Sequence, residues 1–178
     1  MVETTHSTTI KTKMSWEEFL AAGEEWQRWE LVDGEVQFMS PAGSRHGKVI
    51  SNLVAELRAY CKAHREWIDL GPDTAFTIAS GNWRCPDAAL VRADRYPGRN
   101  IPEGPTEFAP DIAFEVYSPG DSAARVARKR RDYQESGVIQ VWIDPGKRSA
   151  EVVYPDRAAG YFHTELPLGA RLDPALSS

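Results

Sequence analysis

The chain has 178 residues and a mass of 19.9 kDa, with 42% hydrophobic and 26% charged residues. This length suits one domain whose core needs no disulfide or structural metal, and the composition excludes disordered and fibrous proteins. The formal net charge of −5 and the pI near 5.4 argue against broad electrostatic binding of nucleic acid, so any phosphate contact must be local.

Membrane and redox signals are weak throughout the sequence. No stretch is apolar enough to cross a bilayer, and the N-terminal segment lacks the apolar core of a secretory signal, so we expect a cytoplasmic protein without membrane contact. The two cysteines, Cys61 and Cys85, lie far apart and belong to no CxxC pair. Free thiols are therefore expected, and neither a zinc site nor a disulfide framework is indicated.

The chain begins with a polar segment before the first ordered element. Residues 1–13 are rich in Thr and Lys and predict a flexible arm, followed by a single domain over residues 14–178. In the segment SWEEFL, Ser15 and Glu18 form a capping-box pattern. This pattern predicts a short helix that ends near Gly23.

A hairpin and a long helix are predicted next. In WELVDGEVQFMS, two apolar runs surround Asp33-Gly34, which predicts strands at about residues 28–32 and 35–39. Apolar residues at spacings of three and four then predict an amphipathic helix that packs on a sheet, through Val49, Ile50, Leu53, Val54, Leu57 and Tyr60.

The remaining segments predict strands and one more helix. WIDLG, TAFTIAS, CPDAALV, DIAFEVYS and IQVWID lie between turn signals and predict strands, with shorter ones at EVVYP and YFHTEL. The Pro- and Gly-rich segment RADRYPGRNIPEGPTEFAP predicts a loop. Between DIAFEVYS and IQVWID, Asp121 or Ser122 caps a helix that Gly137 ends, so the two strands should run parallel or nearly so. The expected fold class is α/β (α+β), with a mixed sheet between helices.

Two carboxylates stand at unusual places in these strands. Alternation along DIAFEVYS puts Glu115 on the face opposite the apolar side chains, and an ionised buried carboxylate costs several kcal/mol unless it is paired, protonated or bound to a metal. Asp87 directly follows Pro86 at the start of another strand. Carboxylates on neighbouring strands can share one hard divalent cation such as Mg²⁺.

A lysine in the basic helix is the third candidate. Lys129 lies three residues after Val126 and four before Tyr133, on the stripe that faces the sheet, whereas Arg128 and Arg131 should point toward solvent. Beside two carboxylates that bind a metal, a lysine can polarise a phosphate or orient an attacking water.

Structural explanations stay open for each candidate. Glu115 could be satisfied by an arginine or by backbone donors, and Asp87 could cap a turn. Lys129 could belong to a solvated basic face. Asp111, in a competing Pro-Asp pair, is interpreted as opening the strand that contains Glu115.

The set Asp87, Glu115 and Lys129 resembles the PD-(D/E)XK nuclease superfamily, and the wider sequence resembles its Uma-two family of restriction endonucleases. The resemblance is carried by short sequence blocks that occur in the same order as in the family and cover about residues 14 to 155. These blocks are WELVDGEV, SPAGSRH, RCPDAAL, PDIAFEVYSP, KRRDYQESGV and VWIDP. This resemblance implies a restriction-endonuclease-like core that binds Mg²⁺, or Mn²⁺ in its place. It also implies an endonuclease, a hydrolase that cuts DNA phosphodiester bonds.

The resemblance assigns a role to each residue. Asp87 takes the place of the aspartate in the PD half of the PD-(D/E)XK motif, and Glu115 takes the place of the acidic residue in its second half. The resemblance implies that both bind the metal. A lysine is expected two residues after Glu115, but Tyr117 is found there. The resemblance therefore implies that Lys129, from the following helix, supplies the catalytic ammonium group.

Other residues and partners follow from the same resemblance. Glu30 and His46 lie in family blocks and are expected to line the catalytic cleft. Arg128 or Arg131 is expected to contact the DNA backbone. Nuclease folds that cut both strands often pair as dimers, so a homodimer is a further expectation. The acidic pI and Tyr117 favour an alternative, a catalytically inactive nuclease-fold module for DNA binding or protein association. A metal-dependent hydrolase of small phosphate substrates is a third interpretation.

Overall fold

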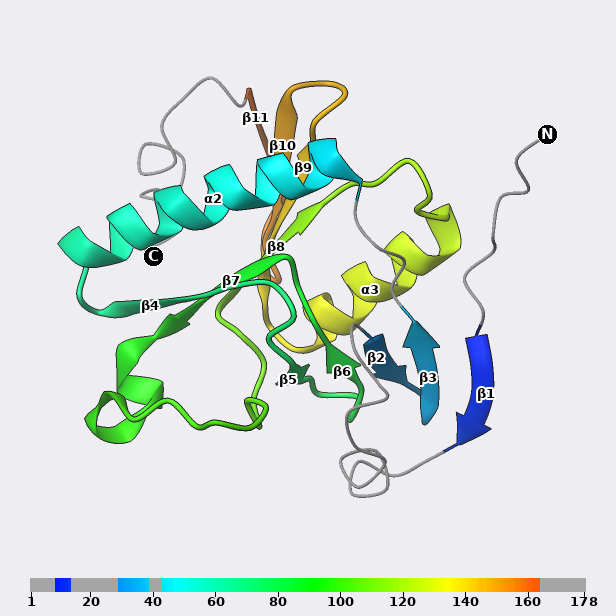
Figure 1. Ribbon diagram of the computed structural model, residues 1–178, viewed down its shortest axis with the longest axis horizontal. Coiled ribbons are helices and arrows are strands. Elements are labelled where there is room, and N and C mark those ends of the chain that lie inside the picture. Colours follow the sequence, from blue (N-terminus) through cyan, green and yellow to red (C-terminus); the bar gives the residue numbers. More distant parts are fainter. Residues whose placement is uncertain (1–8, 14–28, 39–42, 164–178) are drawn as a thin grey trace.

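The structure is a computed structural model that describes residues 9–13, 29–38 and 43–163 (Figure 1). The helix predicted at residues 15–23 lies outside the described residues. The larger of two sheets has six strands in the order β11-β10-β9-β8-β7-β4. Their bounds are β4 (Trp67–Leu70), β7 (Ala88–Arg92), β8 (Ile112–Val116), β9 (Ile139–Asp144), β10 (Ser149–Val153) and β11 (Gly160–His163).

The larger sheet is mixed, as the sequence predicts. β8 and β9 run parallel, with Phe114 opposite Val141, and the other neighbouring strands are antiparallel. The parallel pair is joined through helix α3 (Ala123–Glu135). The expected α+β class with helices on a mixed sheet is therefore confirmed.

The smaller sheet is antiparallel and has the order β1-β3-β2-β6-β5. The strands are β1 (Thr9–Lys13), β2 (Trp29–Val32), β3 (Glu35–Phe38), β5 (Phe76–Thr77) and β6 (Trp83–Arg84). The sequence predicts a flexible arm over residues 1–13. The prediction is wrong for β1, which lies within this stretch and pairs with β3. β6 was not predicted, because two residues are too few to show an alternating pattern.

The predicted hairpin is confirmed at β2 and β3. Val32 lies opposite Glu35, and the two turn residues between them both have positive φ, 54° at Asp33 and 74° at Gly34. A turn with two residues in this region matches the twist of the strands, and Asp-Gly accepts it readily.

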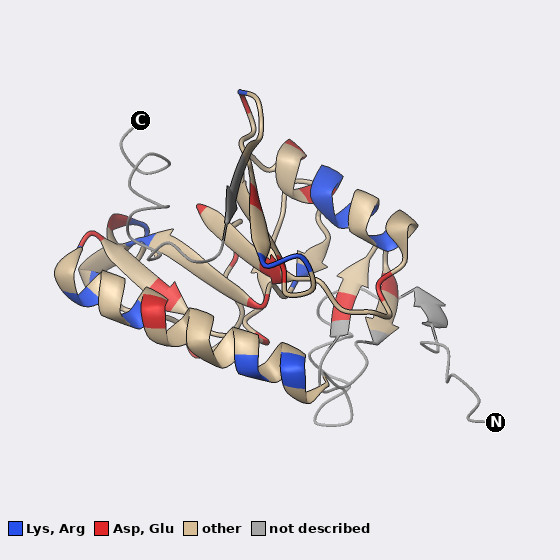
Figure 2. Cartoon of the chain, turned by 90° about the horizontal axis from the view of Figure 1, so that it is seen from above, with Lys and Arg blue, Asp and Glu red and all other residues tan. Residues whose placement is uncertain are grey.

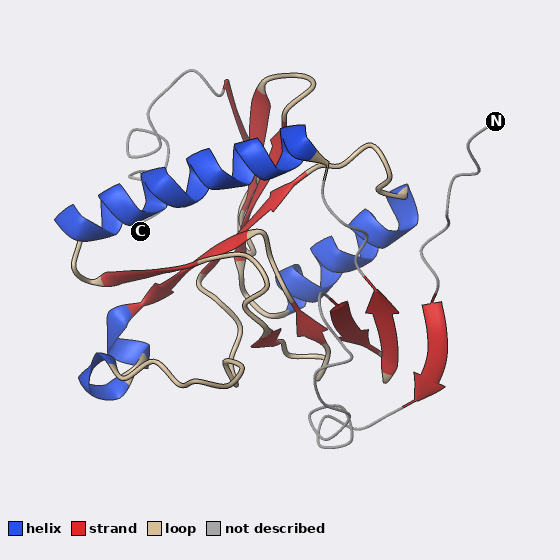
Figure 3. Cartoon of the chain, viewed as in Figure 1, coloured by secondary structure: helices blue, strands red, loops and turns tan. Residues whose placement is uncertain are grey.

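The two long helices cover opposite faces of the larger sheet (Figure 3). Helix α2 (Ser44–Ala63) packs on one face through Ile50, Leu53 and Leu57, as its apolar spacing predicts. Helix α3 packs on the other face, where Tyr133 contacts the same apolar cluster as Trp142. The 3₁₀ turns Ala93–Arg95 and Pro97–Arg99 lie in the segment predicted as a loop.

Local signals place α3 as expected. Ser122 is its N-cap, with the side-chain oxygen accepting a hydrogen bond from the Arg125 amide at 3.2 Å, and Gly137 follows its end with φ 70°. Every residue of β8 is buried. Since alternate residues of β8 face α2 and α3, Glu115 points toward α3.

Cys61 and Cys85 are both buried, and neither forms a disulfide. Burial raises the pKa of each to about 12. Among the described residues, no helix has the length and apolar character needed to cross a membrane.

Candidate active site

Asp87 is held against the end of β8. Its backbone N–H donates to the Phe114 carbonyl at 3.0 Å, and its Oδ2 accepts a hydrogen bond from the Val116 amide at 2.7 Å. These two bonds fix Asp87 beside the strand that carries Glu115. Burial raises the pKa of Asp87, and the nearby Lys129 charge only partly opposes that effect.

Glu115 receives two donors on a single oxygen. Its Oε1 lies 2.6 Å from the Lys129 Nζ and accepts a hydrogen bond from the Tyr133 hydroxyl at 2.8 Å. Burial raises the pKa of Glu115 to about 7 although Lys129 acts to lower it, and Asp87 and Glu30 raise it further. Glu115 is therefore a buried carboxyl among other carboxyls, as the sequence suggests.

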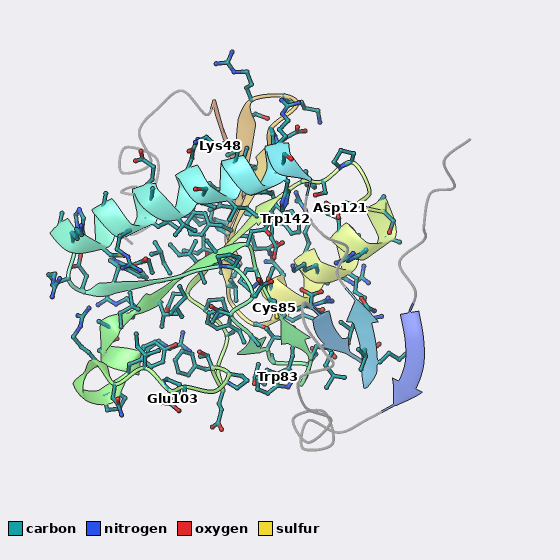
Figure 4. All side chains as sticks on the ribbon, in the orientation of Figure 1. Lys48, Trp83, Cys85, Glu103, Asp121 and Trp142 are labelled. Carbon is teal, nitrogen blue, oxygen red and sulfur yellow. The ribbon has the colours of Figure 1, made fainter. Side chains whose placement is uncertain are left out.

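Lys129 is buried between the sheet and its own helix. Besides Glu115, its Nζ lies 2.9 Å from Glu30 Oε1 and 3.4 Å from the carbonyl oxygen of Cys85, which is labelled in Figure 4. Burial alone would lower the pKa of Lys129, but Glu115 and Glu30 outweigh it and raise the pKa above its ordinary value. The group is thus a fixed positive charge at neutral pH and no proton acceptor.

Glu30 is enclosed rather than open to a cleft. Its side chain is 0% exposed, and its Oε2 accepts from Arg84 at 2.7 Å while Oε1 accepts from the Cys85 amide at 3.2 Å. Burial would raise the pKa of Glu30, but Lys129 and Arg84 together lower it to about 2. Its contacts are those of a residue that holds Lys129 in place.

Arg84 and Asp132 complete the buried charge network, and sequence reasoning missed both. The Arg84 Nε donates to Asp132 Oδ2 at 2.8 Å, and a second guanidinium nitrogen donates to the same oxygen. Burial would lower the pKa of Arg84, but Glu30 and Asp132 raise it. The one available signal was Asp132 itself, a lone acidic residue three positions after Lys129 in a basic run.

His46 reaches the same region from the first turn of α2. Its Nε2 lies 2.9 Å from the Val116 carbonyl oxygen and 3.6 Å from Asp87 Oδ2. Because a carbonyl oxygen only accepts, Nε2 carries the proton. The other ring nitrogen, Nδ1, is buried and has no hydrogen-bond partner within the described part of the chain.

The remaining predicted residues lie outside this cluster. Arg128 pairs with Asp33 of the β2–β3 turn, and Arg131 is exposed. Figure 2 shows Lys and Arg along both long helices. Asp111 lies at the start of β8, where it accepts from the Arg92 amide at 2.8 Å, so it opens the strand as expected. Tyr117 accepts a hydrogen bond from Arg130 at 2.7 Å.

Asp87 and Glu115 are the carboxylates that suit a metal ion. Asp87 Oδ1 and Glu115 Oε2 accept no hydrogen bond from the described residues, and burial raises the pKa of both groups. A divalent cation would favour their charged forms, and Mg²⁺ accepts few protein ligands because it keeps several waters. In the described ranges, no group of three or more His, Cys, Asp or Glu side chains is arranged to hold a metal.

Comparison with known proteins gives a fold and a family. The chain is similar to a crystal structure from Anabaena variabilis titled "a putative nuclease belonging to DUF820", with a TM-score of 0.69 and 22% sequence identity over 84% of each chain. At this identity the likeness shows a shared fold. No functionally curated protein matches the sequence. A family model described as "Putative restriction endonuclease" matches residues 16–177, so the chain belongs to the Uma2 family.

Proposed function

We propose that this protein is a metal-dependent endonuclease that hydrolyses DNA phosphodiester bonds at the cluster of Asp87, Glu115 and Lys129. The observation that carries the proposal is the 2.6 Å contact between the Lys129 Nζ on α3 and Glu115 Oε1 on β8, in a buried setting beside Asp87. A charged lysine next to carboxylates is the chemistry that phosphodiester hydrolysis needs. The family description and the related nuclease fold support the same reaction class.

Each residue has a defined task in this proposal. Asp87 and Glu115 would hold Mg²⁺ or Mn²⁺, which would supply Lewis acidity and an activated water at the site. Lys129 directs its permanent charge toward the scissile phosphate, where negative charge develops. Glu30 fixes the Lys129 ammonium group through the 2.9 Å contact described above.

Surrounding residues position the carboxylates and the substrate. His46 donates to the Val116 carbonyl and lies next to Asp87, so it fixes the end of β8 at the site. Arg131 is exposed on α3, and Arg128 is partly exposed beside it. Both arginines can contact backbone phosphates, which positions DNA without reading its sequence.

A strand-breaking assay tests the proposal. Purified protein should nick or cut plasmid DNA when Mg²⁺ or Mn²⁺ is added, and Asp87→Ala and Lys129→Ala should each abolish cutting. Asp69→Ala is the control, because Asp69 is a carboxylate on β4 of the same sheet that pairs with Arg58, outside the cluster. Equal residual cleavage in Asp87→Ala and Lys129→Ala would indicate a contaminant and remove the assignment.

A non-catalytic module is the second candidate function. The observation in its favour is that Lys129 already pairs with Glu30 and Glu115, a network that needs no metal to be satisfied. Calorimetric titration with Mn²⁺ separates the two functions. Binding that is lost in Glu115→Ala supports the enzyme, whereas no binding by the unaltered protein supports the module.

A further inference from the structure

A cleft lies at the opposite end of β8 from the candidate active site. Its volume is about 400 Å³, and the starts of β8 and β9 and the segment after β10 form its walls. Ile112 lines it, and at about 3.3 Å per residue this point on β8 is roughly 10 Å from Glu115. None of Asp87, Glu115 and Lys129 belongs to its lining.

Three arginines line this cleft, and each guanidinium lies over an aromatic ring. Such stacking favours one placement of the side chain and leaves the guanidinium edges able to donate. The distances from guanidinium carbon to ring centre are 5.2 Å for Arg92 over Trp67, 4.1 Å for Arg95 over Phe108 and 3.8 Å for Arg157 over Tyr154.

Two of the three guanidiniums have no anionic partner in the described part of the chain. Arg95 pairs with Asp111 at 3.2 Å, whereas the side chains of Arg92 and Arg157 make no ion pair or hydrogen bond with described residues. Asp156 is the other carboxylate in the lining. Three cations thus face two carboxylates, and one carboxylate is already paired, in a protein whose net charge is −5.

We propose that this cleft binds a nucleotide-sized, phosphate-bearing ligand, with Arg92 and Arg157 contacting its phosphate. The planar fork of a guanidinium matches phosphate oxygens, and the stacked rings hold both forks in place before binding. A volume of about 400 Å³ is within the range of small-molecule sites. The ligand is a free nucleotide or one nucleotide of a strand, and its binding requires no bond cleavage.

Calorimetric titration without divalent cations tests the cleft separately from any nuclease activity. The probes are deoxyadenosine 5′-monophosphate, inorganic phosphate and a short single-stranded deoxyoligonucleotide. The test variant is Arg92→Gln with Arg157→Gln. Its matched control is Lys62→Gln with Lys147→Gln, which removes two charges from exposed side chains outside the cleft.

We expect saturable binding of the mononucleotide by the unaltered protein and by the lysine control, weakened about tenfold or more in the double arginine variant. Binding of the oligonucleotide alone, with the same loss, identifies a strand as the source of the phosphate. Arg92→Lys with Arg157→Lys keeps the charge without the fork and should bind weakly, which provides a test if the glutamine variant does not fold. The proposal is overturned if the unaltered protein binds none of the probes. It is also overturned if the double arginine-to-glutamine variant binds as tightly as the double lysine-to-glutamine control.

Discussion

Tyr133 shows how much one hydroxyl contributes to the candidate site. Its ring is part of the core under α3, and its O–H donates to the same Glu115 oxygen that Lys129 contacts. Because both donors occupy Oε1, the carboxylate has one orientation, and Oε2 is the oxygen that stays available to a cation. Tyr133 was recognised in the sequence only as a marker of the buried stripe.

We predict that Tyr133→Phe slows DNA cleavage while DNA binding stays unchanged. The variant keeps the ring and its packing but loses one hydrogen bond to a charged group, so the free energy of unfolding should fall by about 1.5–3 kcal/mol. Urea unfolding and single-turnover cleavage measure the two effects. An unchanged rate in a folded variant would show that Tyr133 does not orient Glu115.

The Lys129–Glu115 contact can be measured as an energy. We predict that the double variant Lys129→Met with Glu115→Gln loses less unfolding free energy than the two single variants lose in sum. The difference, which is the coupling energy of the pair, should be about 1–3 kcal/mol. The physical reason is that either single change leaves a buried group without its partner. Chemical unfolding of the four proteins in the cycle gives the coupling, and additive effects would contradict the 2.6 Å contact as a stabilising pair.

At the scale of elements, Arg84 joins the smaller sheet to α3. It lies on β6, is 1% exposed, and bonds to Glu30 of β2 as well as to Asp132 of α3. The helix that carries Lys129 is therefore anchored to the sheet by ionic contacts on the same side as the lysine. This anchoring explains how Lys129 on a helix is held against Glu115 on a strand.

We predict that Arg84→Met destabilises the protein by about 3–5 kcal/mol, since Glu30 and Asp132 would stay buried without their cation. Arg131→Met, on the exposed side of the same helix, should change stability by no more than about 0.5 kcal/mol. Thermal and urea unfolding of both variants provide the comparison. Similar losses in the two variants would mean that the buried network does not anchor α3.

Elements with local signals were predictable from the sequence, and those held by distant partners were not. The Asp33-Gly34 turn, the apolar spacing of α2 and the Ser122 cap each depend on neighbours within a few positions. Arg84 shows no such signal, because its partners are 54 and 48 positions away at Glu30 and Asp132. Glu30 was predicted as a cleft residue from its family block, yet its burial could be seen only once β2, β6 and α3 were brought together.

At the scale of the whole molecule, the two buried carboxyl groups of Glu115 and Glu30 make the free energy of unfolding change with pH in opposite directions. Glu115 moves from 4.5 to a pKa of about 7, so the folded state binds the extra proton and stability falls as pH rises between these values. Glu30 moves from 4.5 to a pKa of about 2, so its contribution is present above 4.5 and is lost as pH falls toward 2.

We therefore predict that, without divalent cations, Glu115→Gln flattens the decline in unfolding free energy between pH values of about 5 and 7. The amide has no proton to lose over this range. Urea unfolding across this range measures the slope of each protein. Parallel slopes would show that Glu115 keeps an ordinary pKa in the folded protein.

The position of Lys129 on α3 also sets an order of events during protein synthesis. A nascent chain presents Glu30, Arg84, Asp87 and Glu115 before it presents Lys129 and the strand β9 that follows. Contacts between such distant parts of a chain form slowly compared with local helices. Under the proposed function, an incomplete chain carries both metal-binding carboxylates without the ammonium group, so cutting begins only after α3 has left the ribosome and docked on the sheet.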